Sequence, residues 1–314
     1  MTKYKEINEE SMMLAEPSSW GGQWTEDKLD AFEKYVKAYL KIMNSNRDKY
    51  SWKLLYFDGF AGSGSRMTSV DNNRIEESLF AEFSQLREET KKETYKGAAE
   101  RVLNIEQRGF DSYYFIDIDK ESSNKLKQKL LRYENSRCLN FITSDANGEL
   151  LKLADKMHRE KNICSLVLLD PFGMQLNWAS IEKLKNTRTD LWILIPTGVI
   201  INRLLDRNGD LTHIERLKTF FGKDEGFLIE YFYRKRQEQT LFGEIDIIEK
   251  IEHPIKRIAE LYIQRLGEIF KNVTPEPLVL YNSKHTPIFH FACASNNETA
   301  IRIASQIIGK KQKQ

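Results

Sequence analysis

Four short groups of residues carry side chains of the types that bind a nucleoside and a flat amine, and each group follows an apolar run. They are Asp58–Gly64 (DGFAGSG), Asp117 with Ile118, Ser144–Ala146 (SDA) and Asp170–Gly173 (DPFG). In an open parallel sheet, ligands bind beyond the carboxyl ends of the strands, where the strand order reverses. We therefore expect the four groups to meet in one pocket.

The first group is a glycine-rich turn, and its predicted cofactor contacts are Asp58, Gly59, Phe60, Gly62 and Gly64. Glycines let a backbone turn tightly and approach a ligand closely. The spacing is not GxGxxG, which disfavours a dinucleotide cofactor. Taken alone, such a turn is equally compatible with an ordinary loop.

The second and third groups are predicted to hold the nucleoside. Asp117 ends the apolar run YYFID, and its carboxylate can accept hydrogen bonds from both ribose hydroxyls, with Ile118 beside it. Asp119 is the competing carboxylate, but its position is more typical of a helix cap. Asp145 could accept the exocyclic amine of an adenine while Ala146 packs on the ring; capping of the next helix is the alternative for Asp145.

The fourth group is predicted to hold the substrate. Asp170 emerges from the most apolar run of the chain, where an uncompensated charge is costly. Asp170 and Pro171 could simply begin a turn. With Phe172 beside it, however, the carboxylate can hold an amine-bearing base by hydrogen bonding and stacking.

The elements that must position these groups alternate along the chain. Strands are predicted at 52–57, 113–117, 138–143, 164–170 and 190–196, with helices at 28–43, 120–133, 148–161 and 178–186. Alternation of this kind predicts a doubly wound, mostly parallel Rossmann-like α/β sheet with both faces covered. A C-terminal antiparallel hairpin is predicted at 278–282 and 287–295, followed by a helix at 298–309.

We expect an irregular segment at 1–24 and a single domain at 25–314. The domain is expected to contain a helical insertion at about 66–110 and a helical, partly basic segment at about 201–270. Thr25 is the predicted N-cap of the first helix.

Charge and composition restrict the class of protein. The 48 basic and 46 acidic residues give a net charge of +2, so any nucleic-acid surface must come from a local cluster. The candidate phosphate contacts are Arg203, Arg234, Lys235 and Arg236, which could equally be ordinary solvated side chains. Three scattered cysteines and no HxxxH pattern predict neither disulfides nor a metal site. No run is long enough for a membrane helix or a signal peptide, so a cytoplasmic protein is expected.

The four groups in their order resemble the successive motifs of class I S-adenosylmethionine-dependent methyltransferases. DPFG is similar to the DPPY-type motif of enzymes that methylate amines of DNA or RNA, with Phe172 in place of the second proline. WTEDKLDAFEKYVKAYL, YFDGFAGSG, YYFIDIDK, LLDPFG and YNSKHTPIFHFACAS resemble the three-Cys-motif partner protein (TcmP) family over roughly residues 20–300.

The resemblance implies S-adenosylmethionine as cofactor and a radical S-adenosylmethionine-like three-Cys-motif protein as partner. It places Asp58, Gly62 and Gly64 around the methionine moiety, Asp117 on the ribose and Asp145 at the adenine. The target amine would then lie against Asp170 and Phe172. The long stretch between Gly64 and Asp117 departs from compact methyltransferases.

We therefore expect methyl transfer from S-adenosylmethionine to a nitrogen of a DNA or RNA base, with Asp170, Pro171 and Phe172 as the catalytic group. One alternative is a methyltransferase-fold protein that regulates its three-Cys-motif partner without turnover of its own. A nicotinamide-dependent oxidoreductase is a third interpretation, which the glycine spacing disfavours.

Overall fold

The computed structural model describes residues 23–64, 96–205, 211, 213–240, 243–282 and 284–312. The predicted irregular segment 1–24 lies almost wholly outside the described residues, and so does most of the predicted insertion at 66–110. From that insertion the structure describes the helix α3 (Ala98–Leu103).

A sheet of eight strands forms the centre of the molecule, with the order β3-β2-β1-β4-β5-β10-β8 and β9 paired to β10. The five parallel strands are β1 (Lys53–Asp58), β2 (Ser112–Asp117), β3 (Leu139–Thr143), β4 (Ile163–Leu169) and β5 (Thr189–Ile195). All five match predicted strands closely. β1 and β4 are buried almost throughout, because helices cover both of their faces.

The C-terminal strands close the other side of the sheet. β10 (Pro287–Ser295) runs antiparallel to β5, and β9 (Leu278–Tyr281) and β8 (Asn272–Val273) pair with its far edge. The predicted hairpin is thus confirmed, and it is part of the main sheet. Together these strands make the doubly wound, mostly parallel Rossmann-like sheet of the methyltransferase type.

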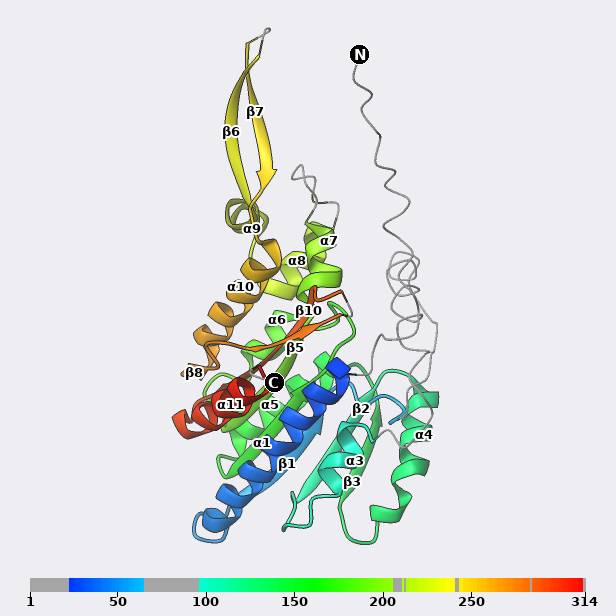
Figure 1. The fold of residues 1–314 in the computed structure, drawn as a ribbon. Coiled ribbons are helices and arrows are strands. Elements are labelled where there is room, and N and C mark those ends of the chain that lie inside the picture. Colours follow the sequence, from blue (N-terminus) through cyan, green and yellow to red (C-terminus); the bar gives the residue numbers. More distant parts are fainter. Residues whose placement is uncertain are drawn as a thin grey trace.

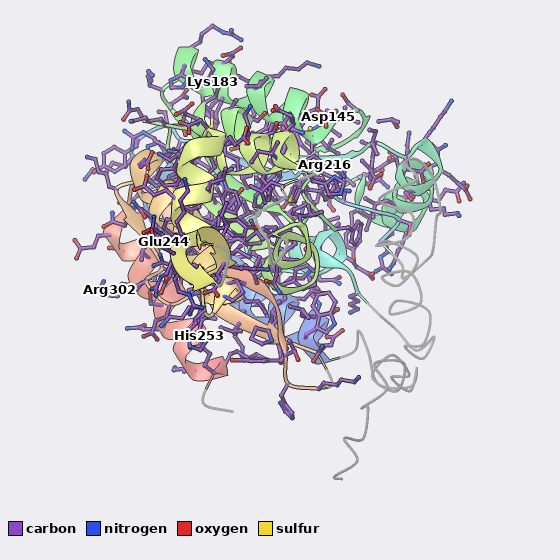
Figure 2. The ribbon with its side chains drawn as sticks, turned by 90° about the horizontal axis from the view of Figure 1, so that it is seen from above. Asp145, Lys183, Arg216, Glu244, His253 and Arg302 are labelled. Carbon is purple, nitrogen blue, oxygen red and sulfur yellow. The ribbon has the colours of Figure 1, made fainter. Side chains whose placement is uncertain are left out.

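The face of the sheet that each helix covers depends on whether the chain runs toward β3 or toward β5. Right-handed crossovers from β1 through β2 to β3 place α3 and α4 (Lys120–Leu130) on one face. The reversal to β4 and β5 places α5 (Ala146–Arg159) and α6 (Trp178–Glu182) on the other. Figure 1 shows α1 (Gln23–Arg47) lying on the face of α3, beside the C-terminal helix α11 (Glu298–Lys311). Viewed from above in Figure 2, Asp145 and Lys183 lie on the opposite side of the molecule from Arg302 of α11.

The first helix is longer than predicted. Its buried stripe includes Phe32, Tyr35 and Val36, which pack into the main hydrophobic core. The helix begins at Gln23, so Thr25 is a helical residue and the prediction that it caps the helix is wrong. The extra first turn brings Trp24 and Lys28 to the carboxyl edge of the sheet, where they matter for the site.

The segment after β5 differs most from expectation. At the start of the segment predicted to be helical and partly basic, the described residues form three short elements, which are a π-helical turn (Thr197–Ile201), α7 (Asn202–Leu204) and α8 (Ile214–Phe221). After α9 (Glu225–Phe232), the basic stretch forms β6 (Tyr233–Thr240), which pairs with β7 (Gly243–Lys250) in a separate antiparallel ribbon. The ribbon projects from the body in Figure 1, and α10 (Pro254–Ile269) returns the chain to it.

Candidate functional site at the carboxyl edge of the sheet

Three carboxylates come from three adjacent strands. Asp58 ends β1, Asp117 ends the neighbouring β2, and Asp170 directly follows β4 on the other side of β1. The strand order reverses at β1 and β4, which is where doubly wound sheets bind their ligands. The structure therefore brings these three predicted residues to one edge, with Asp145 beyond the next strand, β3.

The glycine-rich turn after β1 needs glycine for two different reasons. At Gly62 the constraint is the backbone, because its φ of +61° is a left-handed conformation that residues with a side chain rarely adopt. A Cβ at Gly62 would have open space around it. At Gly59 the constraint is space, because a Cβ would lie 2.8 Å from Cδ2 of Leu169. The turn is also tied to β2, since the Ala61 N–H donates to the Ile116 carbonyl at 2.9 Å.

Asp117 holds this turn in place. One carboxylate oxygen accepts from the Gly62 N–H at 2.8 Å and the other accepts from the Asp119 N–H at 2.8 Å. A carboxylate offers about four acceptor positions, so these bonds are compatible with the predicted role on a ribose. Asp119 caps α4 by accepting from the N–H groups of Glu121 and Ser122. The prediction that Asp119 caps the following helix is thus confirmed.

Ile118 is an apolar side chain left open to solvent beside Asp117. It is 76% exposed, the highest value among the large exposed apolar side chains of the described residues. A single exposed isoleucine is ordinary on a protein surface. Its position at the carboxyl edge, next to the carboxylate predicted to bind ribose, suits packing against a flat base.

Asp145 serves as the N-cap of α5. Helix capping was the alternative to adenine binding that the sequence left open for this residue. Its carboxylate accepts from the Gly148 N–H at 3.1 Å and from Nδ2 of Asn147 at 3.2 Å. The side chain is nevertheless exposed, whereas Ala146 behind it is buried. A role at the adenine stays a prediction for both residues.

Asp58 is the most enclosed acid of the site. It is 2% exposed and accepts hydrogen bonds from the Tyr56 hydroxyl at 3.2 Å and the Phe60 N–H at 3.3 Å. Burial, and next the negative charge of Asp170, raise its pKa to about 7. A cation entering the pocket would favour the ionised carboxylate. Asp58 is therefore suited to respond to a positively charged cofactor.

Asp170 forms an ion pair that the sequence did not reveal. Nζ of Lys28 lies 2.5 Å from its Oδ2, and the Lys28 side chain is only 6% exposed. The same ammonium lies 5.5 Å from the centre of the Trp24 ring, which stacks on Phe289 of β10 at 5.2 Å. The only sequence signal was the lysine's place on the buried stripe of the helix, four residues before Phe32. The first turns of α1 thus form one wall of the site.

Asn147 was also missed. Its buried side chain lies between Asp145 and the loop that follows Asp170, and it bonds to backbone groups of Gln175 and Asn177. An asparagine near a helix start is usual, so no sequence pattern distinguished it.

The predicted phosphate contacts do not lie among the carboxylates. Arg234, Lys235 and Arg236 are exposed on β6, at the base of the ribbon. The side chain of Arg203 lies outside the described residues. The base of the ribbon is fixed to the segment after β5, because Nζ of Lys250 donates to the carbonyls of Asn202 and Leu205 at 2.6 and 2.5 Å.

In the described part of the chain, no group of three or more His, Cys, Asp or Glu side chains is arranged to hold a metal ion. None of the described helices is long and apolar enough to cross a membrane.

No family model and no curated protein matches the sequence. Among solved structures, the chain is similar to protein LPL1258 of Legionella pneumophila, assigned to family DUF519, with 13% identity, a TM-score of 0.40, and coverage of 88% of this chain and 97% of that chain. A conserved hypothetical protein of Streptococcus pyogenes matches with 10% identity, 64% and 89% coverage and a TM-score of 0.27. A candidate methyltransferase of Escherichia coli, yhhF, matches with 12% identity, 68% and 85% coverage and a TM-score of 0.24.

Scores of this size carry no functional argument. The methyltransferase-like fold is supported by the strand order of the chain itself, with five parallel strands and an antiparallel strand beside β5. Membership of the TcmP family stays a prediction. The structure establishes an α/β protein of the Rossmann-like methyltransferase type, with three carboxylates at the carboxyl edge of its parallel strands.

Proposed function

We propose that this protein transfers a methyl group from S-adenosylmethionine to an amine nitrogen of a nucleic-acid base. The observation that carries the proposal is the convergence of Asp58, Asp117 and Asp170 on the point where the strand order reverses, beside a glycine turn held by Asp117. Each of these residues suits one part of the proposed ligands.

The pocket residues have separate roles in this proposal. Asp117 would accept the ribose hydroxyls, Ile118 would pack on the adenine and Asp145 would accept its amine. Asp58, whose pKa is raised to about 7, would face the positive end of the cofactor. When bound, S-adenosylmethionine supplies an activated methyl group on a sulfonium, so the protein has mainly to align the reacting atoms.

Asp170 and Phe172 would hold the acceptor. The carboxylate would accept an N–H of the amine and direct the nitrogen lone pair toward the methyl carbon, while Phe172 stacks on the base. As the new N–C bond forms, the C–S bond breaks and its electrons stay on sulfur. The nitrogen then loses one proton to solvent. Lys28 would hold the Asp170 carboxylate in place throughout.

A polynucleotide acceptor is supported by the ribbon. Its base is fixed to the segment that follows β5, on the edge where the acceptor would lie, and it exposes three consecutive basic residues. Basic side chains of this kind position a sugar-phosphate backbone without reading its sequence. Acidic residues also occur in the ribbon, with Glu249 opposite Arg234, so the basic surface is confined to the base of β6.

Calorimetric titration of S-adenosylmethionine and S-adenosylhomocysteine tests the cofactor assignment. We expect saturable binding to the wild type and at least a tenfold loss in Asp117→Ala. Asp119→Ala is the matched control, because it removes a neighbouring carboxylate that only caps α4. Failure of the folded wild type to bind either ligand would refute the enzyme assignment.

Incubation with methyl-labelled cofactor and separate DNA and RNA pools then tests the acceptor. Label is expected in a base amine and is expected to disappear in Asp170→Ala. Binding without any transfer would instead support the regulatory alternative.

A further inference from the structure

The side chain of Asn147 bridges two parts of the site that come from different strands. Its Nδ2 donates to Oδ1 of Asp145 at 3.2 Å and to the Gln175 carbonyl at 2.8 Å. Its Oδ1 accepts from the Asn177 N–H at 2.8 Å. The Nδ2 end therefore bonds both the predicted adenine contact and the loop that follows Asp170, and the Oδ1 end holds the same loop.

This bridge is enclosed and uses both ends of the amide. Asn147 is 7% exposed, and both of its Nδ2 hydrogens and its carbonyl oxygen have partners. Removal of the side chain would leave the Asn177 N–H and the Gln175 carbonyl without this partner, at a cost typical of buried polar groups. The amide therefore cannot move at one end without affecting the other.

The loop from Pro171 to Asn177 depends on this bridge for its shape. Within the loop, the Gly173 N–H donates to Oε1 of Gln175 at 3.1 Å, and Leu176 is fully buried. The loop is connected to the first turn of α5 by two hydrogen bonds, which join its Gln175 carbonyl and its Asn177 N–H to Asn147. The loop directly follows Asp170, so its conformation would set where the acceptor amine can lie.

We propose that Asn147 is a positioning residue that couples occupancy of the cofactor site to the order of the acceptor loop 171–177, so that bound cofactor orders the loop that receives the acceptor. The inference rests on the proposed function. A donor from the adenine would immobilise the Asp145 carboxylate, and the shared amide would transmit that restraint to Gln175 and Asn177. Coupling of this kind needs no large displacement, only a difference in order between the two states.

Hydrogen exchange with and without S-adenosylhomocysteine tests this coupling. In the wild type, the amides of residues 173–177 are expected to exchange several-fold more slowly when the ligand is bound. In Asn147→Ala, calorimetry is expected to show ligand affinity within about threefold of wild type, because Asp145 keeps its own carboxylate. The loop amides of this variant are expected to exchange at the same rate with and without ligand.

Two variants separate positioning from a loss of structure. Asn147→Asp keeps the acceptor for the Asn177 N–H, loses both donors and is expected to lose the coupling while remaining folded. Asn140→Ala is the matched control, because it removes an amide on the edge strand β3 that donates to the Tyr113 carbonyl of β2, away from the loop. The coupling in this variant is expected to equal that of the wild type.

The outcomes distinguish this inference from the proposed function. Equal slowing of the loop in the wild type and both Asn147 variants overturns the coupling and leaves the methyltransferase proposal intact. Ligand binding to the wild type without slower amide exchange at residues 173–177 also overturns the coupling and leaves the methyltransferase proposal intact. Absence of ligand binding to the wild type overturns both.

Discussion

Lys28 and Asp170 form an ion pair between the first helix and the end of β4, with Nζ and Oδ2 2.5 Å apart and side-chain exposures of 6% and 22%. The lysine contributes the only ammonium that the described residues show in contact with this carboxylate. The carboxylate predicted to contact the acceptor is thereby held in one orientation by a helix that precedes the whole sheet in sequence.

Removal of the lysine is expected to leave Asp170 without a compensating charge in a largely enclosed place. Lys28→Met should lower the free energy of unfolding by about 2 kcal/mol, less than for a fully buried pair because Asp170 keeps some solvent. Lys37→Met on the same helix should cost under about 0.5 kcal/mol, since its pair with Glu33 is exposed. Urea unfolding measures both. The double variant Lys28→Met/Asp170→Asn should recover part of the loss; strictly additive losses would contradict the assignment.

The buried acid Asp58 is expected to make stability fall as the pH rises. Its folded-state pKa of about 7 lies above that of an unfolded aspartate, so its contribution is complete below about pH 4 and is lost as the pH rises through 7. The loss is on the order of 4 kcal/mol for such a shift. Asp58→Asn should therefore gain stability relative to the ligand-free wild type between pH 4 and 8. Thermal unfolding across this range measures the difference.

Asp119→Asn is a control in which the effect on stability is expected to change with pH in the opposite direction. Hydrogen bonds from Ser122 lower the pKa of Asp119, so its contribution is present at neutral pH and is lost as the pH falls through the folded pKa. This variant should lose stability at pH 7 and approach the wild type in acid. A pH dependence of Asp58→Asn parallel to the wild type would mean that Asp58 stays ionised.

Ile118 is expected to contribute to cofactor affinity and not to folding. Because the side chain is 76% exposed, Ile118→Ser should leave the free energy of unfolding almost unchanged. If the adenine packs on it, the lost contact should weaken S-adenosylhomocysteine binding by about 1 kcal/mol, or roughly fivefold in Kd. Leu131→Ser, at a 50% exposed position after α4, should change neither quantity. Unchanged affinity in Ile118→Ser would remove the isoleucine from the site.

The base of the ribbon is expected to control the salt dependence of nucleic-acid binding. Replacement of Arg234, Lys235 and Arg236 by glutamine should reduce the slope of log affinity against log salt by about 2 to 3, if each contacts one phosphate. The matched control replaces Lys183, Lys185 and Arg188, three exposed basic residues just before β5 at the opposite edge of the sheet. Fluorescence anisotropy with labelled duplexes measures both slopes. Equal slopes in the two variants would exclude a ribbon contact.

The sequence predicted the parts of the site that depend on local pattern. Buried apolar runs identify parallel strands, and the residue after each run must lie at the carboxyl edge, so Asp58, Asp117 and Asp170 could be placed without coordinates. The roles of these residues toward a cofactor and an acceptor stay predictions. The N-cap of α5 was foreseen only as an alternative for Asp145.

The parts that escaped prediction depend on distant partners or weak patterns. Lys28 pairs with a residue 142 positions away, which no local spacing encodes. The strand β6 (YRKRQEQT) is polar after its first residue, so it lacks the alternation that marks a half-buried strand. It pairs with β7 in a ribbon, at the place where the sequence predicted only a partly basic stretch within a helical segment.

The contact between α1 and α11 also has a consequence for the order of assembly during synthesis. Lys311 donates to Asp27 and Asp30 at 2.9 and 3.1 Å, the first of these across 284 positions of sequence. A nascent chain makes α1 early, yet Lys311, the shared partner of Asp27 and Asp30 in its first turns, is synthesised only with α11. Until then the first turns of α1, which carry Lys28, lack the two hydrogen bonds from Lys311. The helix that holds Lys28 against Asp170 therefore gains its full set of contacts late, only after residue 311 has been synthesised.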